Sequence, residues 1–163
     1  MNILSTKELS QDSLIDFFTE HWGSPEMVIS SGTYDCSTLD GFAALNQEKQ
    51  IVGLVTYILK EAECEIISLD SLEEGKGIGT LLVQKVEEAA LQHKRKVITL
   101  ITTNDNLHAL KFYQKRGYML SKLHLNAVEK AREIKPEIPM VGNDGIPIRD
   151  EIELRKAMAI AKL

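Results

Sequence analysis

Short runs of apolar and β-branched residues, several of them alternating with polar ones, recur along the chain and predict strands. Strands are expected over residues 2–5, 41–45, 51–59, 63–69, 97–102, 118–125 and 151–155. The polar stretch NQEKQ between the second and third runs predicts a hairpin. The run CEIISL has the apolar and β-branched content of a central strand.

Apolar residues spaced by three and four positions predict two helices with one buried face. The first covers residues 11–21, with Ser10 as N-cap and Leu14, Ile15 and Phe18 on one face. The second follows a cluster of glycines, and its expected apolar face is formed by Ile78, Leu81, Leu82, Val86 and Ala89.

A third helix is expected over residues 106–116, because Gly117 suits a left-handed C-terminal cap. Residues 22–40 carry no clear pattern. Residues 126–150 contain three prolines and the turn-forming sequence NDG, and they predict a long insertion between the last two strands. Loops of this length in a compact domain tend to be functional, so substrate choice is expected to reside here. Arg149 and Asp150 could recognise a polar acceptor, although a salt bridge between them is the simpler expectation.

This order of strands and helices, without repeats or low-complexity linkers, predicts one α/β domain over residues 1–163. The net charge of −5 gives no electrostatic support for binding nucleic acid or anionic lipid. The N-terminus does not resemble a signal peptide, and no apolar run has the length of a membrane span. Cys36 and Cys64 form no paired motif, which favours free thiols and a cytoplasmic protein.

Three glycines fall within five residues of the stretch SLDSLEEGKGIGTLL, between an expected strand and an expected helix. Backbone N–H groups at a helix N-terminus bind anions, and glycine lets the backbone approach a ligand closely. Glycines also serve tight turns, so the stretch alone leaves both interpretations open. Gly79 is followed by Thr80 and Leu81, so a Walker loop is excluded, and the spacing of the glycines does not fit a dinucleotide fingerprint.

The stretch resembles the acetyl-CoA-binding motif of the GNAT N-acetyltransferases, Gln/Arg-x-x-Gly-x-Gly/Ala, which reads here Glu74-Gly75-Lys76-Gly77-Ile78-Gly79. A second signature of that family, Asn-x-x-Ala-x-x-Phe-Tyr followed by Gly and an aromatic residue, is matched by Asn106, Ala109, Phe112, Tyr113, Gly117 and Tyr118. The resemblance covers about residues 41–118. It implies a mixed, mostly antiparallel central sheet flanked by helices.

The resemblance also implies where acetyl-CoA would bind. The pantetheine arm would pair with the backbone of Leu69 and Ser71, and the pyrophosphate would lie on the loop and first helical turn, which comprise Glu74, Gly75, Lys76, Gly77, Ile78, Gly79 and Thr80. Glu74 departs from the family pattern, because a carboxylate there would repel the pyrophosphate unless it points into solvent, while Lys76 offers a compensating charge.

Three further residues receive candidate roles. Asn106 would orient the pantetheine or acyl end, or would simply cap its helix. Tyr113 falls where the family carries the acid that protonates or stabilises the departing thiolate, although it could be a core aromatic residue. Glu65 lies on the strand that carries a base in several members of the family, but charged residues at strand starts are commonly solvated.

The expected function is therefore transfer of an acetyl group from acetyl-CoA to a primary amine by direct attack in a ternary complex, the chemistry of an N-acetyltransferase of EC class 2.3.1. The acceptor could be a small molecule or a protein amine. An acyl-CoA-binding module without transferase activity is the alternative, and a nucleotide-binding fold is a weaker one. The four histidines show no ligand spacing, so no metal site is expected. An edge strand near the C-terminus could support a homodimer.

Overall fold

The computed structural model describes residues 1–158, so the last five residues of the expected domain lie outside the described part. The described chain divides into two units. Unit 1 consists of residues 1–27, 35–98 and 158, and unit 2 consists of residues 28–34 and 99–157.

Unit 1 is built on four strands in the order β1-β4-β5-β6. Their bounds are Asn2–Ser5, Asp40–Leu45, Ile51–Leu59 and Cys64–Ser71. Neighbouring strands are antiparallel, and β4 and β5 form the hairpin expected from the sequence. A register shift between Thr56 and Tyr57, where β5 pairs with β6, marks an irregularity in β6 around Ile67. Such bulges change which side chains share a face of the sheet.

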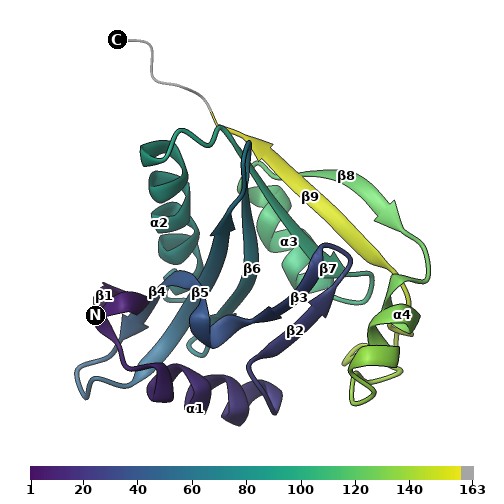
Figure 1. The fold of residues 1–163 in the computed structure, drawn as a ribbon, viewed down its shortest axis with the longest axis horizontal. Helices are drawn as coiled ribbons and strands as arrows, with labels where there is room; N and C mark the ends of the chain where they lie inside the picture. The colour runs from purple at the N-terminus through teal and green to yellow at the C-terminus, as the bar shows by residue number, and fades with distance from the viewer. Residues whose placement is uncertain (159–163) are drawn as a thin grey trace. The chain divides into compact units, whose positions relative to one another are not determined.

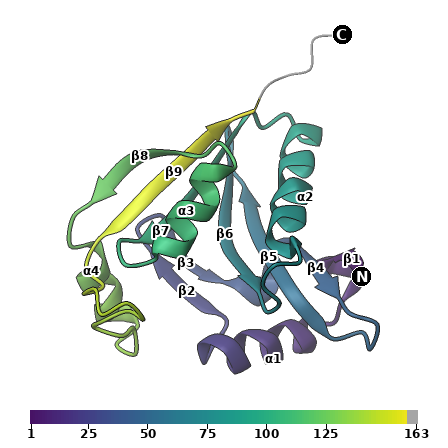
Figure 2. The same ribbon diagram turned by 180° about the vertical axis from the view of Figure 1, so that it is seen from behind.

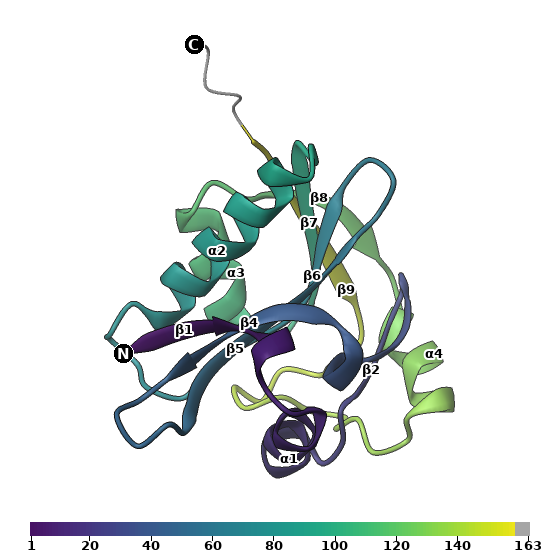
Figure 3. The ribbon, with the colours of Figure 1, turned by 60° about the vertical axis from the view of Figure 1, so that its left-hand side comes forward.

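Two helices cover opposite faces of these strands (Figure 3). Helix α2, Ile78–Gln92, lies over Gly53, where an added Cβ would meet Ile78 and Leu82. Helix α1, Gln11–Trp22, sends the Trp22 indole to Asp70, which pairs with Leu54 and therefore points away from the Gly53 face. Ser10 caps α1 as expected by accepting a hydrogen bond from the Ser13 N–H.

Unit 2 contains strands in the order β7-β9-β8, with β8 and β9 antiparallel. Strand β7, Val97–Thr103, begins in unit 1, whereas β8, Met119–His124, and β9, Glu151–Ala157, lie wholly in unit 2. Helix α3, Leu107–Lys115, lies beside these strands (Figure 2). Most of a two-stranded hairpin, β2 at Glu26–Ile29 and β3 at Gly32–Asp35, also belongs to this unit.

Short 3-10 helices occur at Thr6–Glu8 and Cys36–Thr38, and helix α4 occupies Ala127–Ile134 (Figure 1). The expected fold class, mixed α/β with mostly antiparallel strands and flanking helices, is confirmed. No helix among residues 1–158 combines the length and apolar character needed to cross a bilayer.

Three expectations need correction. Leu81 is 40% exposed, because the buried face of α2 follows Ile78, Leu82, Val86 and Ala89 and leaves position 81 at its margin. The β2–β3 hairpin was not predicted, since its strands have only four residues each. The insertion at 126–150 contains the unpredicted α4, whose helical face buries only Val128 and Ala131, too few apolar positions for a clear period.

Gly41 allows the close packing of β4 against β5, because a Cβ at this position would collide with the Val55 carbonyl oxygen. A Cβ at Gly53 would instead meet Cγ2 of Ile78 and Cδ1 of Leu82, which are side-chain atoms of α2, so a small shift of the helix can make room without breaking the pairing of two strands. We therefore expect Gly41→Ala to lower the free energy of unfolding by about 2 kcal/mol or more, and Gly53→Ala to cost less. Urea unfolding measures both, and equal losses would contradict this packing argument.

Candidate functional site

The connection from β6 to α2 forms a glycine loop, defined here as residues 72–77, at the N-terminus of a helix of unit 1. Gly77 is the N-cap of α2 with φ 72°, and Gly75 has φ 77°, both in the left-handed region that favours glycine. Within the described residues, α2 has no side-chain cap. The N-cap residue therefore provides no side-chain acceptor for the N–H groups of the first turn, and a helix N-terminus of this kind binds phosphate.

The glycine loop carries two carboxylates, Glu73 and Glu74, and one ammonium, Lys76. Glu74 is exposed, so its carboxylate can be hydrated. The Lys76 ammonium lies 2.9 Å from a Glu73 carboxylate oxygen, and this ion pair uses the charge expected to compensate Glu74. Binding of an anion by this loop would therefore depend on backbone N–H groups and the dipole of α2 rather than on side-chain charge.

Strand β6 enters the glycine loop with side chains on both faces. Leu69 and Ser71, the expected pantetheine-pairing residues, are opposite Val55 and Gly53 and so share the α2 face. Ser68 lies on the other face, where its hydroxyl and that of Thr56 form a buried hydrogen bond of 2.5 Å. The expected binding residues 69–80 are therefore contiguous within unit 1.

Glu65, the expected base, is almost completely buried near the start of β6. The Lys60 ammonium lies 2.5 Å from its Oε1 atom, and only 2% of the residue is exposed. The Glu65 carboxylate is buried while the Lys60 side chain is partly exposed, so removal of the lysine would leave a buried charge without its counter-charge. Cys64 beside it is completely buried, and burial raises the pKa of its thiol to about 12, as expected for a core residue rather than a nucleophile.

Asp70 is a candidate functional residue that the sequence analysis did not identify. Its Oδ1 accepts a 3.0 Å hydrogen bond from Trp22 Nε1, while its buried Oδ2 has no hydrogen-bond partner among residues 1–158. Burial raises the pKa of this carboxyl to about 6, and the Trp22 hydrogen bond and nearby His21 oppose the rise. The sequence feature that could have identified Asp70 is the position of an acidic residue at the end of the apolar strand before the glycine loop.

The other two candidates lie in unit 2. Asn106 is the N-cap of α3, and its side chain accepts a 3.1 Å hydrogen bond from the Ala109 N–H, so its capping role is confirmed. Tyr113 is 6% exposed, and its ring contacts those of Phe112 and Tyr118 edge-on, with centroids 5.1 and 5.4 Å away. These contacts fix the Tyr113 ring.

Most of the polar contacts of residues 126–150 hold the chain of unit 2 in place. The Arg132 guanidinium donates hydrogen bonds to the carbonyls of Ile138, Pro139 and Ile148. The expected salt bridge joins Arg149 to Asp150 at 3.1 Å. Asp150 also accepts a hydrogen bond from the Asn126 N–H, and these contacts lower the pKa of its carboxyl. Asp150 is thus committed to the structure of this segment.

Comparison with known proteins gives a consistent result. Residues 8–118 match the family described as "Acetyltransferase (GNAT) family". The uncharacterized protein YxbD of Bacillus subtilis (strain 168) is 59% identical over 158 residues, covering 97% of this chain and 99% of YxbD.

Two solved structures show the same fold. An IAA acetyltransferase from Bacillus cereus ATCC 14579 is 20% identical with a TM-score of 0.70, covering 96% of this chain and 100% of that one. An Elizabethkingia anophelis GNAT family acetyltransferase with acetyl-CoA bound is 23% identical with a TM-score of 0.62, covering 75% of this chain and 78% of that one.

Proposed function

This chain belongs to the GNAT acetyltransferase family, and we propose that it is an N-acetyltransferase that transfers an acetyl group from acetyl-CoA to a primary amine. The observation that carries the proposal is the uncapped N-terminus of α2, preceded by the left-handed Gly75 and Gly77. The pyrophosphate would accept hydrogen bonds from backbone N–H groups there, and Leu69 and Ser71 would pair with the pantetheine arm. Acetyl-CoA bound to the GNAT acetyltransferase of E. anophelis supports this choice of cosubstrate.

The reaction follows from the chemistry of a thioester. The amine nitrogen attacks the acetyl carbonyl carbon, a C–N bond forms, the C–S bond breaks, and CoA leaves as a thiolate. The acceptor nitrogen must lose a proton and the thiolate must gain one, so a base and an acid assist. Since both reactants meet directly, no acetylated protein intermediate forms.

Tyr113 is the proposed acid. Its ring is held between Phe112 and Tyr118, which would keep its phenol in one orientation. Phenol and thiol have ordinary pKa values of about 10 and about 8.5, so proton transfer to the thiolate is nearly balanced. Asn106 would orient the pantetheine while still capping α3 through its side-chain oxygen.

The proposed base is a carboxylate of β6, and two residues compete for the role. Glu65 was the expectation from the family, but it already pairs with Lys60 in the core. Asp70 has one oxygen held by Trp22 and a second without a hydrogen-bond partner among the described residues. Its pKa is raised to about 6, so the carboxyl is still mostly ionised at pH 7. A base whose pKa lies this close to the working pH accepts a proton efficiently. We therefore favour Asp70.

An acyl-CoA-binding module without transferase activity remains the alternative, and Glu74 is its basis. Thiol release from acetyl-CoA with a panel of small amines and peptides separates the two functions. Release with at least one amine supports the transferase, whereas CoA binding without release supports the module. Calorimetry with ATP, NAD and CoA tests the weaker nucleotide-binding hypothesis, which predicts a response to ATP or NAD.

The remaining expectations stay proposals: a cytoplasmic protein that uses no metal and does not bind nucleic acid. A homodimer is also proposed, since the edge strand β8 exposes Met119, Leu120 and Leu123. Size-exclusion chromatography with light scattering tests the dimer.

Gly77→Ala tests the phosphate site. The change introduces a Cβ at a left-handed position with open space around it, so the fold should survive with a loss of about 1 kcal/mol. The shifted backbone should weaken CoA binding by roughly tenfold, the equivalent of one misplaced hydrogen-bonding group. Calorimetry measures the dissociation constant. Gly145→Ala is the matched control, because Gly145 has φ 75° and equally open surroundings. Equal affinities in the two variants would remove Gly77 from the site.

Tyr113→Phe tests the acid. The change removes only the phenolic oxygen, so thiol release should fall by about 10²-fold while CoA affinity is retained. Tyr118→Phe, a buried tyrosine in contact with the same ring, is the control and should keep most of the activity. An unchanged rate in Tyr113→Phe would exclude it as the acid.

Asp70 and Trp22 together test the base. Asp70 must be ionised to accept a proton, so kcat/KM should fall below an apparent pKa of about 6. Asp70→Asn should lower kcat/KM by about 10²-fold and abolish this acid limb. Trp22→Phe removes the hydrogen bond that stabilises the carboxylate, so the limb should move to higher pH.

Each variant in this series is measured with the same amine, so that ionisation of the acceptor cancels between profiles. An acid limb that persists in Asp70→Asn would exclude Asp70 as the base, and the same measurement on Glu65→Gln then becomes the test of Glu65.

A further inference from the structure

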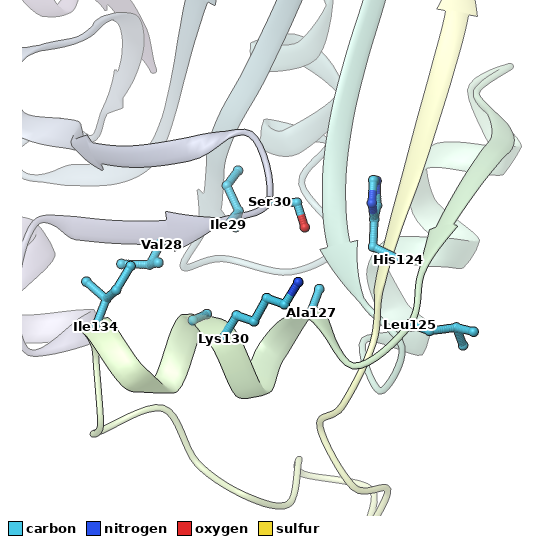
Figure 4. Close-up of a pocket in the computed structure, with 9 residues that line it drawn as sticks. Val28, Ile29, Ser30, His124, Leu125, Ala127, Lys130 and Ile134 are labelled. Carbon is cyan, nitrogen blue, oxygen red and sulfur yellow. The ribbon is translucent and has the colours of Figure 1, made fainter.

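Unit 2 contains a cavity of about 420 Å³ beside α4, away from the glycine loop in the sequence (Figure 4). It is lined by the β2–β3 hairpin, the end of β8 and one face of α4. This volume fits a small organic molecule of amino-acid size. Its α4 residues belong to the segment 126–150, in which substrate choice is expected to reside, and none of the catalytic or cosubstrate-binding roles assigned above uses the residues that line it.

The cavity has an apolar end and a polar end. Val28 and Ile134 lie close together at the apolar end (Figure 4). Ile134 is 60% exposed, so a hydrocarbon group that enters would remove apolar surface from water. Lys130, Ser30 and His124 lie toward the opposite end (Figure 4). The ligand that fits such a cavity has a short hydrocarbon part and one polar head.

Lys130 supplies the positive charge of the polar end. Its side chain runs over the cavity, with the amino group directed toward Ser30 and His124 (Figure 4). In the part of the chain that the structure describes, Lys130 forms no salt bridge. The nearby Glu151 carboxylate instead accepts hydrogen bonds from the N–H and hydroxyl of Ser30, at 2.8 and 2.5 Å. The ammonium is therefore available to an anionic ligand.

His124 supplies a second polar group. Its Nε2 is buried and has no hydrogen-bond partner within residues 1–158, which is uncommon for a buried polar atom. His124 is paired with Glu151 across β8 and β9, so a buried carboxyl lies beside it. One ammonium next to one buried carboxyl favours a singly charged anion, because a phosphate dianion would be repelled by Glu151.

From these features we infer that this cavity binds the acceptor of the acetyl group and recognises it by a carboxylate. Lys130 pairs with the carboxylate, His124 hydrogen-bonds to it, and Val28 and Ile134 contact the hydrocarbon part. The acceptor class is then an amine that carries a carboxylate, as amino acids do. This inference rests on the proposed N-acetyltransferase function.

Matched acceptors test the inference through thiol release from acetyl-CoA. L-leucine is compared with 3-methylbutylamine, and L-phenylalanine with 2-phenylethylamine, so that each pair differs by the carboxylate. We expect KM to be about tenfold lower for the carboxylated member. Lys130→Met should raise that KM about tenfold, leaving kcat and the KM of the plain amine unchanged. Lys122→Met, an exposed lysine on β8, is the control.

A binding measurement separates failure of this inference from failure of the proposed function. 4-Methylpentanoate has the carboxylate and hydrocarbon of leucine but no amine, and its binding to the purified protein is measured by calorimetry. Binding that is lost in Lys130→Met and kept in Lys122→Met supports the cavity even if no amine releases thiol. Turnover of plain and carboxylated amines with equal KM, or 4-methylpentanoate binding that is unchanged in Lys130→Met, overturns the inference and leaves the transferase standing.

Discussion

The backbone N–H groups in the first turn of α2 are the feature on which the proposed chemistry depends. A helix normally begins with a side chain that accepts a hydrogen bond from one of these groups. Gly77 has no side chain to do so, and its left-handed conformation turns the chain from β6 directly into the helix. The proposed site would attract an anion without a fixed positive charge, and it would tolerate Glu74 because that carboxylate is exposed.

The strand before this loop serves both the fold and the proposed reaction. In a regular strand, residues separated by an odd number of positions point to opposite faces, as Glu65 and Asp70 would. The irregularity in β6 lies between them, so that Glu65, Ser68 and Asp70 share one face. The buried Glu65 is neutralised by Lys60, whereas Asp70 Oδ2 has no hydrogen-bond partner in the part of the chain that the structure describes. Two carboxylates of one strand thus have different environments, which is how a protein assigns a structural role to one and a chemical role to the other.

Much of the fold could be predicted because its pattern is local. Residues near in sequence determine the strands at 2–5 and 51–59, the Ser10 cap and the left-handed Gly117 that follows α3 and its C-cap Arg116. Helix α4 and the β2–β3 hairpin could not be predicted, since their elements are short and rely on distant contacts. Arg132, for example, bonds to carbonyls up to sixteen residues away, and Ser30 bonds to Glu151.

The sequence by itself determined the order of the main strands and helices, the glycine loop and the two motifs shared with the GNAT family, because each depends on residue type and spacing. Only the tertiary structure decided which charged side chains are paired with an opposite charge and which have a polar atom without a hydrogen-bond partner among the described residues. The pairing of Glu65 with Lys60 and the raised pKa of Asp70 depend on burial and on partners from other elements. The position of Lys130 over its cavity, without a salt bridge among residues 1–158, depends on how α4 packs. Burial is a property of packing that no local run of residues encodes.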